Sequence, residues 1–289
     1  MELVLQYIVN GLMNGGLYAL LAVGIVLVYK STAVFNFAMG QMLMLGAFFL
    51  WSFTNLGLPI WVSIILCLVC GALMGLLIER FTMRPLIGQP LISAVLATLA
   101  LSYILDALSK LVWGAASESL PKFLPGESIK VGNIVFAHDL LWVAGIAIIS
   151  VLLLLAFYQR TRTGLSMRAV AESHKVAEAR GIKIRNIFSV TWAFAGVIAV
   201  IGGMLLGYRL GVTQFLSIIS LKAFPVVLFG GMDSIPGVLV AGLIVGVLES
   251  LAGGLIGTWL MGSMPYIVLL LALIFRPYGL FGLSRIERI

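Results

Sequence analysis

The polar side chains that could act chemically in this sequence are mostly neutral, and they gather in two stretches. Asn36 and Gln41 follow the first long apolar run. A second group of hydroxyl and amide side chains lies shortly before Pro225, at Thr213, Gln214, Ser217 and Ser220. Such groups can hydrogen-bond a small polar solute without trapping it, so they are candidates to line a passage through lipid. The alternative is hydrogen bonding between helices, which contributes under ~2 kcal/mol per contact.

Ionisable groups inside apolar stretches are fewer. Glu249 lies well within an apolar run, and Lys222 stands shortly before Pro225. Charges inside a membrane often mark a functional site. A proton-driven carrier, however, usually needs a chain of buried ionisable groups, and two residues do not make one.

Signatures of catalysis are missing from the sequence. The apolar runs contain no Ser/His/Asp set, no paired carboxylates and no HExxH motif. The chain also lacks the GxxxxGK[ST] loop that binds nucleotide phosphates, so it cannot hydrolyse ATP alone. We therefore expect neither an enzyme nor a cofactor bound by this chain.

The composition requires lipid as the solvent. Of the 289 residues, 62% are apolar and only 10% are charged, whereas soluble domains carry about 25% charged residues. A soluble fold of this length has too little interior to bury so much apolar surface. A soluble enzyme, a disordered tail and a nucleic-acid-binding domain are therefore poor interpretations, and we expect no nucleic-acid partner.

Apolar runs of about 20 residues predict helices that cross a bilayer. Eight or nine such runs occur, near Leu3–Tyr29, Val34–Phe53, Leu58–Ile78, Leu91–Trp113, Leu140–Tyr158, Ile187–Leu210, Leu216–Gly231, Gly237–Ile256 and Trp259–Phe275. The fold class is therefore an all-α polytopic membrane protein. Gly40 and Gly46 in the second run, and Pro225 in the seventh, indicate interrupted helices of the kind found beside cavities. Simple kinks are the alternative.

The distribution of Lys and Arg predicts the orientation in the membrane. The stretch Arg160–Arg185 holds seven basic residues against Glu172 and Glu178, whereas Ala115–Asp139 is nearly balanced in charge. Because Lys and Arg accumulate in cytoplasmic loops, the first stretch is expected inside and the second outside. Further basic residues in the tail are Arg276, Arg285 and Arg288. We therefore expect the N-terminus outside and the C-terminus in the cytoplasm.

The basic stretch also has the pattern of a short helix outside the bilayer. Ser166 can cap such a helix and Gly181 can end it. A stripe of mostly small residues recurs at helical spacing: Met167, Val170, Ala171, His174 and Ala177. We expect this stripe to dock into a groove of a partner protein. A helix lying on the lipid surface is the alternative, but Ala and Val bury little area there.

This stretch, GLSMRAVAESHKVAEARGI, resembles the coupling segment of permease subunits from ABC importers of the branched-chain amino acid (hydrophobic amino acid uptake) family. Further similar stretches are GLYALLAVGIVLVY, FNFAMGQMLMLGAF, RPLIGQPLISAVLATLALSYIL, FGGMDSIPGVLVAGLIVGVLES and RPYGLFG. The chain departs from the family where NFAHGE is common, at Met39 and Gln41, and where GGLGS or GGMGS is common, at Asp233. The resemblance therefore implies an amino acid or a similar small polar solute.

The resemblance implies a single transmembrane permease domain over residues 1–289, with a coupling segment at about 163–185. It adds Arg168, Gly181 and Ile182 to the ATPase-coupling residues. The implied partners are two cytoplasmic ATP-binding subunits that use ATP, a second related permease or a copy of this one, and a periplasmic solute-binding protein. The implied location is the inner membrane of a bacterium. A stand-alone ion-coupled secondary transporter or channel is the alternative.

Overall fold

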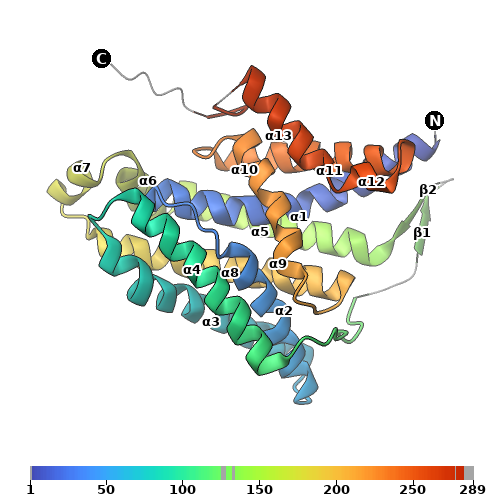
Figure 1. The fold of residues 1–289 in the computed structure, drawn as a ribbon, viewed down its shortest axis with the longest axis horizontal. Coiled ribbons are helices and arrows are strands. Elements are labelled where there is room, and N and C mark those ends of the chain that lie inside the picture. The colour runs from blue at the N-terminus through green and yellow to red at the C-terminus, as the bar shows by residue number, and fades with distance from the viewer. Residues whose placement is uncertain (1, 125–127, 132–133, 277, 283–289) are drawn as a thin grey trace. The chain divides into compact units, whose positions relative to one another are not determined.

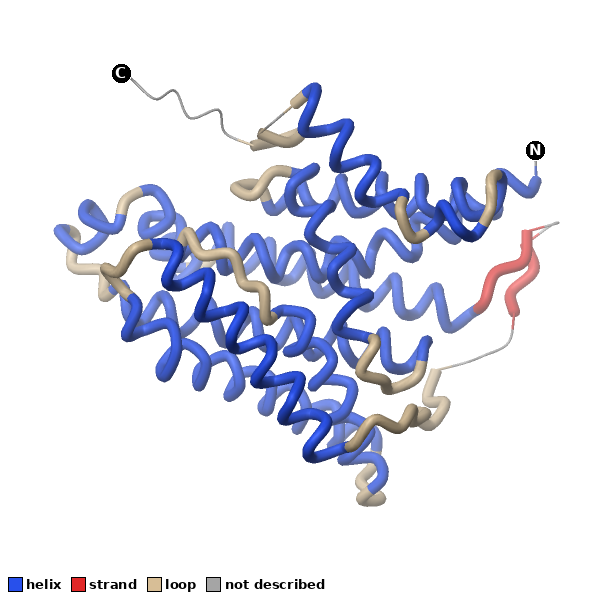
Figure 2. Tube along the Cα trace, in the orientation of Figure 1, coloured by secondary structure: helices blue, strands red, loops and turns tan. Residues whose placement is uncertain are grey.

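A computed structural model of the protein describes residues 2–124, 128–131, 134–276 and 278–282. Helices make up nearly all of the described chain, as Figure 2 shows in blue. The basic tail residues Arg285 and Arg288, and Pro277 of the RPYGLFG stretch, lie outside the described residues. The all-α fold class predicted from the sequence is confirmed.

Among the described residues, six helical stretches are long and apolar enough to cross a membrane. They are built on α1 (Glu2–Thr32), α3 (Ile60–Ile78), α4 (Leu91–Trp113), α5 (His138–Arg160), α8 (Ile184–Leu210) and α11 (Ile235–Leu255). In a bilayer every backbone N–H and C=O must be satisfied within the protein, so apolar runs of this length become helices. The six helices match six of the apolar runs.

Three shorter apolar stretches account for the remaining runs. They are α2 (Met39–Asn55), the series α9 (Leu216–Ile219), η3 (Ser220–Lys222) and α10 (Ala223–Gly230), and the pair α12 (Thr258–Met261) and α13 (Met264–Phe275). The predicted interruption of the seventh run is the 3-10 turn η3, which precedes Pro225. The interruption near the second run lies before α2, between Ala33 and Ala38, and not at Gly40 or Gly46.

The loop between α4 and α5 contains a β-hairpin that the sequence analysis did not anticipate. Strand β1 (Ser128–Val131) pairs antiparallel with β2 (Ile134–Ala137), and Ser128 lies opposite Ala137. The hairpin runs directly into α5 at His138. Two short helices that follow α5 in the sequence, α6 (Arg162–Glu172) and α7 (His174–Ala179), occupy the predicted coupling segment (Figure 1).

The chain divides into two compact units, each built from segments that are distant in the sequence. The first unit comprises Met1–Val26, Leu124–Val151 and Leu221–Ile289, and the second comprises Leu27–Phe123 and Leu152–Ser220. Helices α1 and α5 contribute to both units. This division into units does not test the prediction of a single transmembrane domain, which stays a prediction.

In the second unit, α2 and α3 pack along α8 through glycines. A β-carbon on Gly75 would lie 2.0 Å from the Trp192 carbonyl oxygen, and one on Gly203 would lie 1.9 Å from that of Leu43. No side chain fits at these distances, so glycine allows the backbones to touch. Within lipid the hydrophobic effect does not drive helices together, so their association depends on close van der Waals packing. Small residues at the interface allow this packing.

In the first unit, α1 and α11 also pack closely through glycines. A β-carbon on Gly15 would lie 2.6 Å from the Gly242 carbonyl oxygen, and one on Gly246 would lie 2.4 Å from that of Gly11. Two glycines on each helix therefore face one another. These contacts fix the rotation of α11 about its axis and thereby the direction of the polar residues that it carries.

Candidate functional site

The two predicted clusters of polar residues meet in the second unit. A β-carbon on Gly40, near the start of α2, would lie 2.4 Å from the Ser220 hydroxyl and 2.6 Å from the Ser217 carbonyl oxygen. Helix α2 also packs against α9. The residues around Asn36 and Gln41 and those between Thr213 and Ser220 therefore form one polar cluster, although the sequence separates them widely.

The break between α1 and α2 is held by side chains. Ala33 has φ of 56°, which turns the chain out of α1. The Asn36 side-chain oxygen accepts a hydrogen bond from the Ala38 N–H at 3.0 Å. The Thr98 hydroxyl of α4 accepts one from the Phe37 N–H and donates to the Phe35 carbonyl oxygen. Asn36 is completely buried, so in this conformation it shapes the break and does not face water.

The hydroxyl and amide groups before the second break are mostly satisfied locally. Ser217 donates to the Gln214 carbonyl oxygen at 2.9 Å, and Ser220 donates to that of Ser217 at 2.6 Å. The Gln214 side chain accepts a hydrogen bond from Ser109 and donates to the Gly114 carbonyl oxygen. Gln214 therefore ties this segment to α4, while Thr213 is half-buried.

Gln41 differs from its neighbours. Its side chain is half-buried, and its buried side-chain oxygen has no hydrogen-bond partner among the described residues. An unpaired buried acceptor costs free energy that a bound polar group would recover. Gln41 is therefore the member of the polar cluster best suited to contact a solute.

The predicted coupling segment forms two helices, and the predicted cap at Ser166 is wrong. The Thr161 hydroxyl accepts a hydrogen bond from the Gly164 N–H, so Thr161 is the cap and α6 begins at Arg162. Ser173 then breaks the helix and caps α7 by accepting from the Val176 N–H. Gly181 ends α7 as predicted, with φ of 79°. The Ile182 N–H donates to the Ala177 carbonyl oxygen, which closes the C-terminal turn.

The predicted stripe of small residues is largely internal. Met167 and Val170 are completely buried and Ala177 is 2% exposed, because α6 and α7 pack against α8. These three side chains are therefore not a free docking face, and that expectation is corrected. Periodicity indicated a buried face correctly, but the burial is against this chain's own helix.

The other residues of the segment lie at its edges. Ala171 is half-buried, and His174 is exposed but brings Nε2 to 3.3 Å from the Ser31 carbonyl oxygen. The Arg168 guanidinium lies over the Tyr158 ring and donates to the Tyr158 carbonyl oxygen, which anchors α6 to the end of α5.

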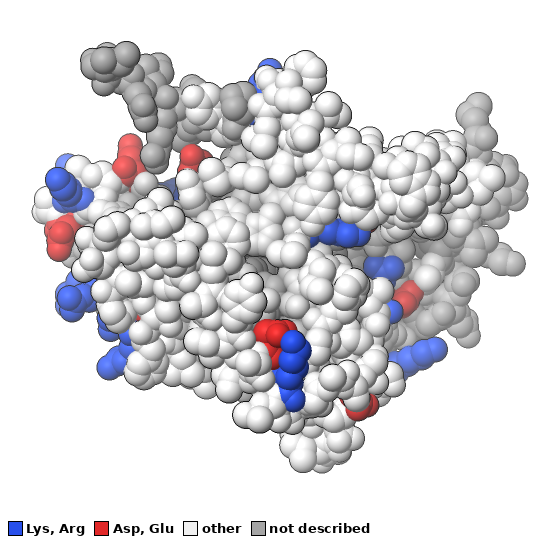
Figure 3. Space-filling view, in the orientation of Figure 1, with Lys and Arg blue, Asp and Glu red and all other residues white. Residues whose placement is uncertain are grey.

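The outward face of the two helices is formed by other residues. Leu165 is 59% exposed and Val176 is 60% exposed. Charged side chains of both signs lie at the left of Figure 3, where Figure 1 places α6 and α7. An apolar surface rimmed by charge is typical of protein contacts.

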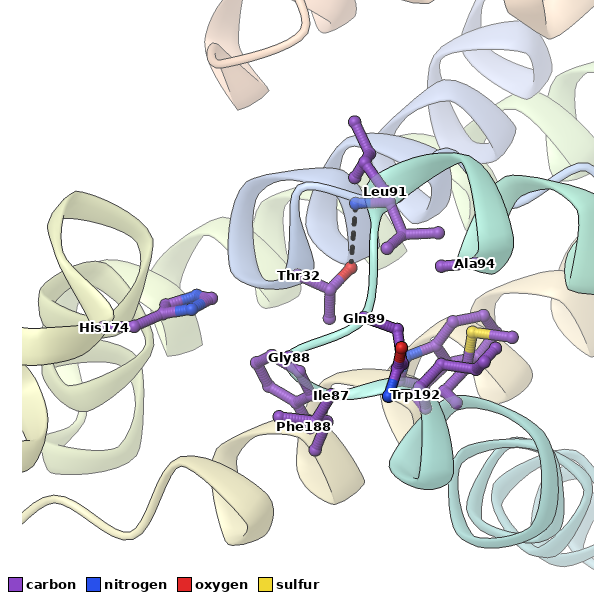
Figure 4. Close-up of a pocket in the computed structure, with 12 residues that line it drawn as sticks. Thr32, Ile87, Gly88, Gln89, Leu91, Ala94, His174, Phe188 and Trp192 are labelled. Atoms are coloured by element: carbon purple, nitrogen blue, oxygen red, sulfur yellow. Dashed lines mark hydrogen bonds between the residues drawn. The ribbon is translucent and has the colours of Figure 1, made fainter.

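A cavity of about 210 Å³ lies beside α7 in the second unit. Figure 4 shows the His174 ring pointing from α7 toward the loop that carries Gly88 and Gln89. The remaining lining residues are Thr32, Val34, Met83, Leu86, Ile87, Leu91, Ala94, Phe188 and Trp192. The cavity is mostly apolar and places the coupling segment next to the ends of α1, α4 and α8.

An ion-pair network at the end of α3 was not predicted. Glu79 is 1% exposed and receives two hydrogen bonds from Arg84, at 3.0 and 2.8 Å. The Ser189 hydroxyl of α8 donates to the same carboxylate at 3.0 Å. The π-helical turn η1 (Glu79–Met83) positions the pair. Both carboxylate oxygens have partners, so this network fastens α3 to α8.

The first unit holds a second buried pair that sequence spacing did not reveal. The Lys222 ammonium lies 2.5 Å from Oε1 of Glu249, and their side chains are 22% and 2% exposed. Lys222 ends η3 and Glu249 lies on α11. The sequence marked each residue as an intramembrane charge, but 27 residues separate them, and only the packing of α10 on α11 brings them together.

Comparison with known proteins gives consistent matches along the chain. The family described as "Branched-chain amino acid transport system / permease component" matches residues 7–274. The permease protein BraD of a high-affinity branched-chain amino acid transport system from Pseudomonas aeruginosa is 28% identical, over 99% of this chain and 98% of that protein. LivH from Escherichia coli is 27% identical, over 99% and 97% of the two chains.

A third relative comes from an archaeon. The probable branched-chain amino acid transport permease protein LivH of Methanocaldococcus jannaschii is 31% identical, over 95% of this chain and 91% of that protein. These relatives are transport permease components and not enzymes. Their names, the apolar helices and the nearly complete coverage agree: the chain belongs to the family of branched-chain amino acid transport system permease components.

Proposed function

We propose that this chain is the membrane-spanning permease subunit of a bacterial ABC importer for an amino acid or a similar small polar solute. The observation that carries the proposal is the match of almost the whole chain to permease components, over a fold that adds the short helices α6 and α7 between long apolar ones. Its partners would be two ATP-binding subunits, a second permease or another copy, and a periplasmic solute-binding protein.

The packing of α6 suggests how a partner's movement would reach the membrane helices. Arg168 fixes α6 to the end of α5, and α6 packs on α8. Helix α8 in turn packs along α2 and α3, and at the glycines of these contacts the helix backbones touch directly. Movement of α6 by an ATPase would therefore displace α8 and the polar cluster at the start of α2. Coupling would depend on different contacts in the two states.

We assign the contact with the ATPase to the residues on the outward face of the segment, Leu165 and Val176. Ala171 lies at the edge of this face. Leu165 and Val176 offer exposed apolar contacts beside several basic side chains. The buried residues Met167, Val170 and Ala177 would transmit force into α8. Gly181 and Ile182 would fix where α7 ends.

The orientation follows the distribution of charge. The basic segment with α6 and α7 would lie in the cytoplasm, which leaves the loop containing the β-hairpin outside. The nine apolar stretches would then place the N-terminus outside and the C-terminus inside. This orientation puts the coupling helices on the side where ATP is available.

The experiment that tests this function is ATP-dependent uptake into proteoliposomes. The chain is co-expressed with its partners and purified as a complex, and uptake of labelled leucine is measured with the binding protein outside and ATP inside. We expect uptake only with ATP and the binding protein. Uptake driven by an ion gradient with this chain alone would instead establish the alternative, a secondary transporter or channel.

A further inference from the structure

The buried pair of Lys222 and Glu249 has features that structural packing does not explain. Taking two opposite charges out of water is costly, and a buried ion pair is often no more stabilising than apolar side chains of similar volume. Within lipid-embedded helices such charges persist mainly where they serve transport or binding. The pair is therefore a candidate site for transport or binding, in addition to joining η3 to α11.

The pair is also incompletely satisfied. Glu249 Oε1 receives the Lys222 ammonium, but the buried Oε2 has no hydrogen-bond partner among the described residues. An ammonium group carries three N–H donors, and Lys222 remains 22% exposed. The site thus combines a buried acceptor that has no donor among the described residues with a cation that is only partly buried. The Glu79 carboxylate, by contrast, has partners on both oxygens.

We propose that Lys222 and Glu249 form the subsite that binds the ammonium and carboxylate groups of a zwitterionic amino acid during transport. The ammonium of the solute takes the place of Lys222 at the Glu249 carboxylate, and the solute's carboxylate binds the released Lys222 ammonium. This inference rests on the proposed function and specifies its solute as a free α-amino acid with an uncharged side chain.

The physical reason is charge balance. Without a solute, Lys222 and Glu249 together carry no net charge. When a zwitterion binds between them, two ion pairs form, and the net charge of the site is still zero. A solute with only an ammonium or only a carboxylate would leave one buried charge unpaired, which is strongly unfavourable. The subsite therefore selects zwitterions over cations and anions of the same shape.

The test uses the whole complex in proteoliposomes, with leucine as the probe, and measures leucine transported per ATP hydrolysed. Glu249→Gln should lower this ratio at least about ten-fold, which corresponds to about 1.4 kcal/mol. Hydrolysis should still be stimulated by the loaded binding protein. Glu79→Gln is the matched control, since it removes the other buried carboxylate, and it should leave the ratio of the folded complex unchanged.

The double variant Lys222→Met/Glu249→Gln separates binding from packing, because it leaves no unpaired charge. A subsite predicts that its transport ratio stays at least about ten-fold below the wild type. A ratio restored to the wild-type value would show that the pair is only structural and would overturn the proposal.

A competition assay on the wild-type complex does not depend on any variant folding. Labelled leucine is bound to the detergent-purified complex and challenged with leucine, leucinamide or 4-methylpentanoate, which keep the side chain but lack one charge each. We expect leucine alone to displace the label. Equal displacement by either analogue would overturn the subsite. The proposed function itself would be contradicted only if the wild-type complex and its binding protein imported neither leucine nor any other amino acid or small polar solute with ATP.

Discussion

Gly40 and Ser220 lie in direct contact: a β-carbon on Gly40 would lie 2.4 Å from the Ser220 hydroxyl oxygen. Each residue stands beside a break, Gly40 just after the interruption between α1 and α2, and Ser220 at the start of η3. Backbone breaks at membrane depth are tolerated where they line a cavity or are buried in protein. The contact joins both breaks into one cluster, in which the buried Gln41 side-chain oxygen has no hydrogen-bond partner within the described part of the chain.

We predict that Gly40→Ala weakens the contact between α2 and α9. The added methyl group cannot fit, and overpacking of this kind costs about 1–3 kcal/mol. Thermal unfolding of the purified complex should shift downward and uptake should fall. Gly145→Ala on α5 is the matched control, because nothing lies within 4 Å of its β-carbon position, and it should unfold like the wild type.

Gln41→Met should impair transport with little effect on folding. Methionine keeps the length of the side chain but removes the amide, and the oxygen that it removes has no partner among the described residues. We expect lower maximal uptake at normal membrane levels of the protein. Uptake equal to the wild type would remove Gln41 from the pathway.

Asn36→Leu, in contrast, should reduce the amount of folded protein. The lost side-chain oxygen accepts a hydrogen bond from the Ala38 N–H, and leaving that buried N–H without its partner costs about 1–3 kcal/mol. Asn36→Asp keeps an acceptor at the same place and should retain more folded protein than Asn36→Leu. The measurement is the monodisperse yield of each variant after mild-detergent extraction.

Val176→Asp tests the outward face of the coupling segment. Because Val176 is 60% exposed, the change should alter stability by no more than about 0.5 kcal/mol. It would nevertheless place a charge in the apolar contact that we propose with the ATPase. We expect the loaded binding protein to stimulate ATP hydrolysis less.

The matched control for Val176→Asp is Met167→Ala, on the buried face of the same segment. Met167 is completely buried, so this change should cost about 2–5 kcal/mol of stability. Normal stimulation in Val176→Asp would show that the ATPase does not dock on this face.

Cysteine labelling tests the orientation. Ser119→Cys and Lys175→Cys, each in a background without Cys67 and Cys70, place exposed thiols in the loop between α4 and α5 and in α7. An impermeant maleimide added to intact cells should label Ser119→Cys only. Lys175 is preferable to Ser173, whose hydroxyl caps α7. Labelling of Lys175→Cys from outside would show that the orientation is the opposite of the one proposed, and it would contradict the coupling proposal.

The sequence alone determined the membrane helices, because helix formation in lipid depends on local properties. The run Leu91–Trp113 was predicted with the bounds that α4 has, since a long apolar segment must satisfy its own backbone hydrogen bonds. The end of α7 at Gly181 was equally local, because a positive φ favours glycine. The polar clusters were also visible as residue types, though not as one site.

What the tertiary structure decided was which faces meet. Gly46 looked like a helix break, but it lies within α2 and lets α8 approach closely. A glycine has the same sequence signature in both roles. The stripe of Met167, Val170 and Ala177 showed that one face is buried, but periodicity does not name the surface that buries it.

The pairing of Lys222 with Glu249 is the clearest example. Their separation of 27 residues matches no helical repeat, so no local rule connects them. The glycine contacts of α11 with α1 fix the rotation of α11, and the packing of α10 on α11 then brings the two charges together. Local interactions can be read along a chain, whereas long-range contacts exist only once its helices have packed.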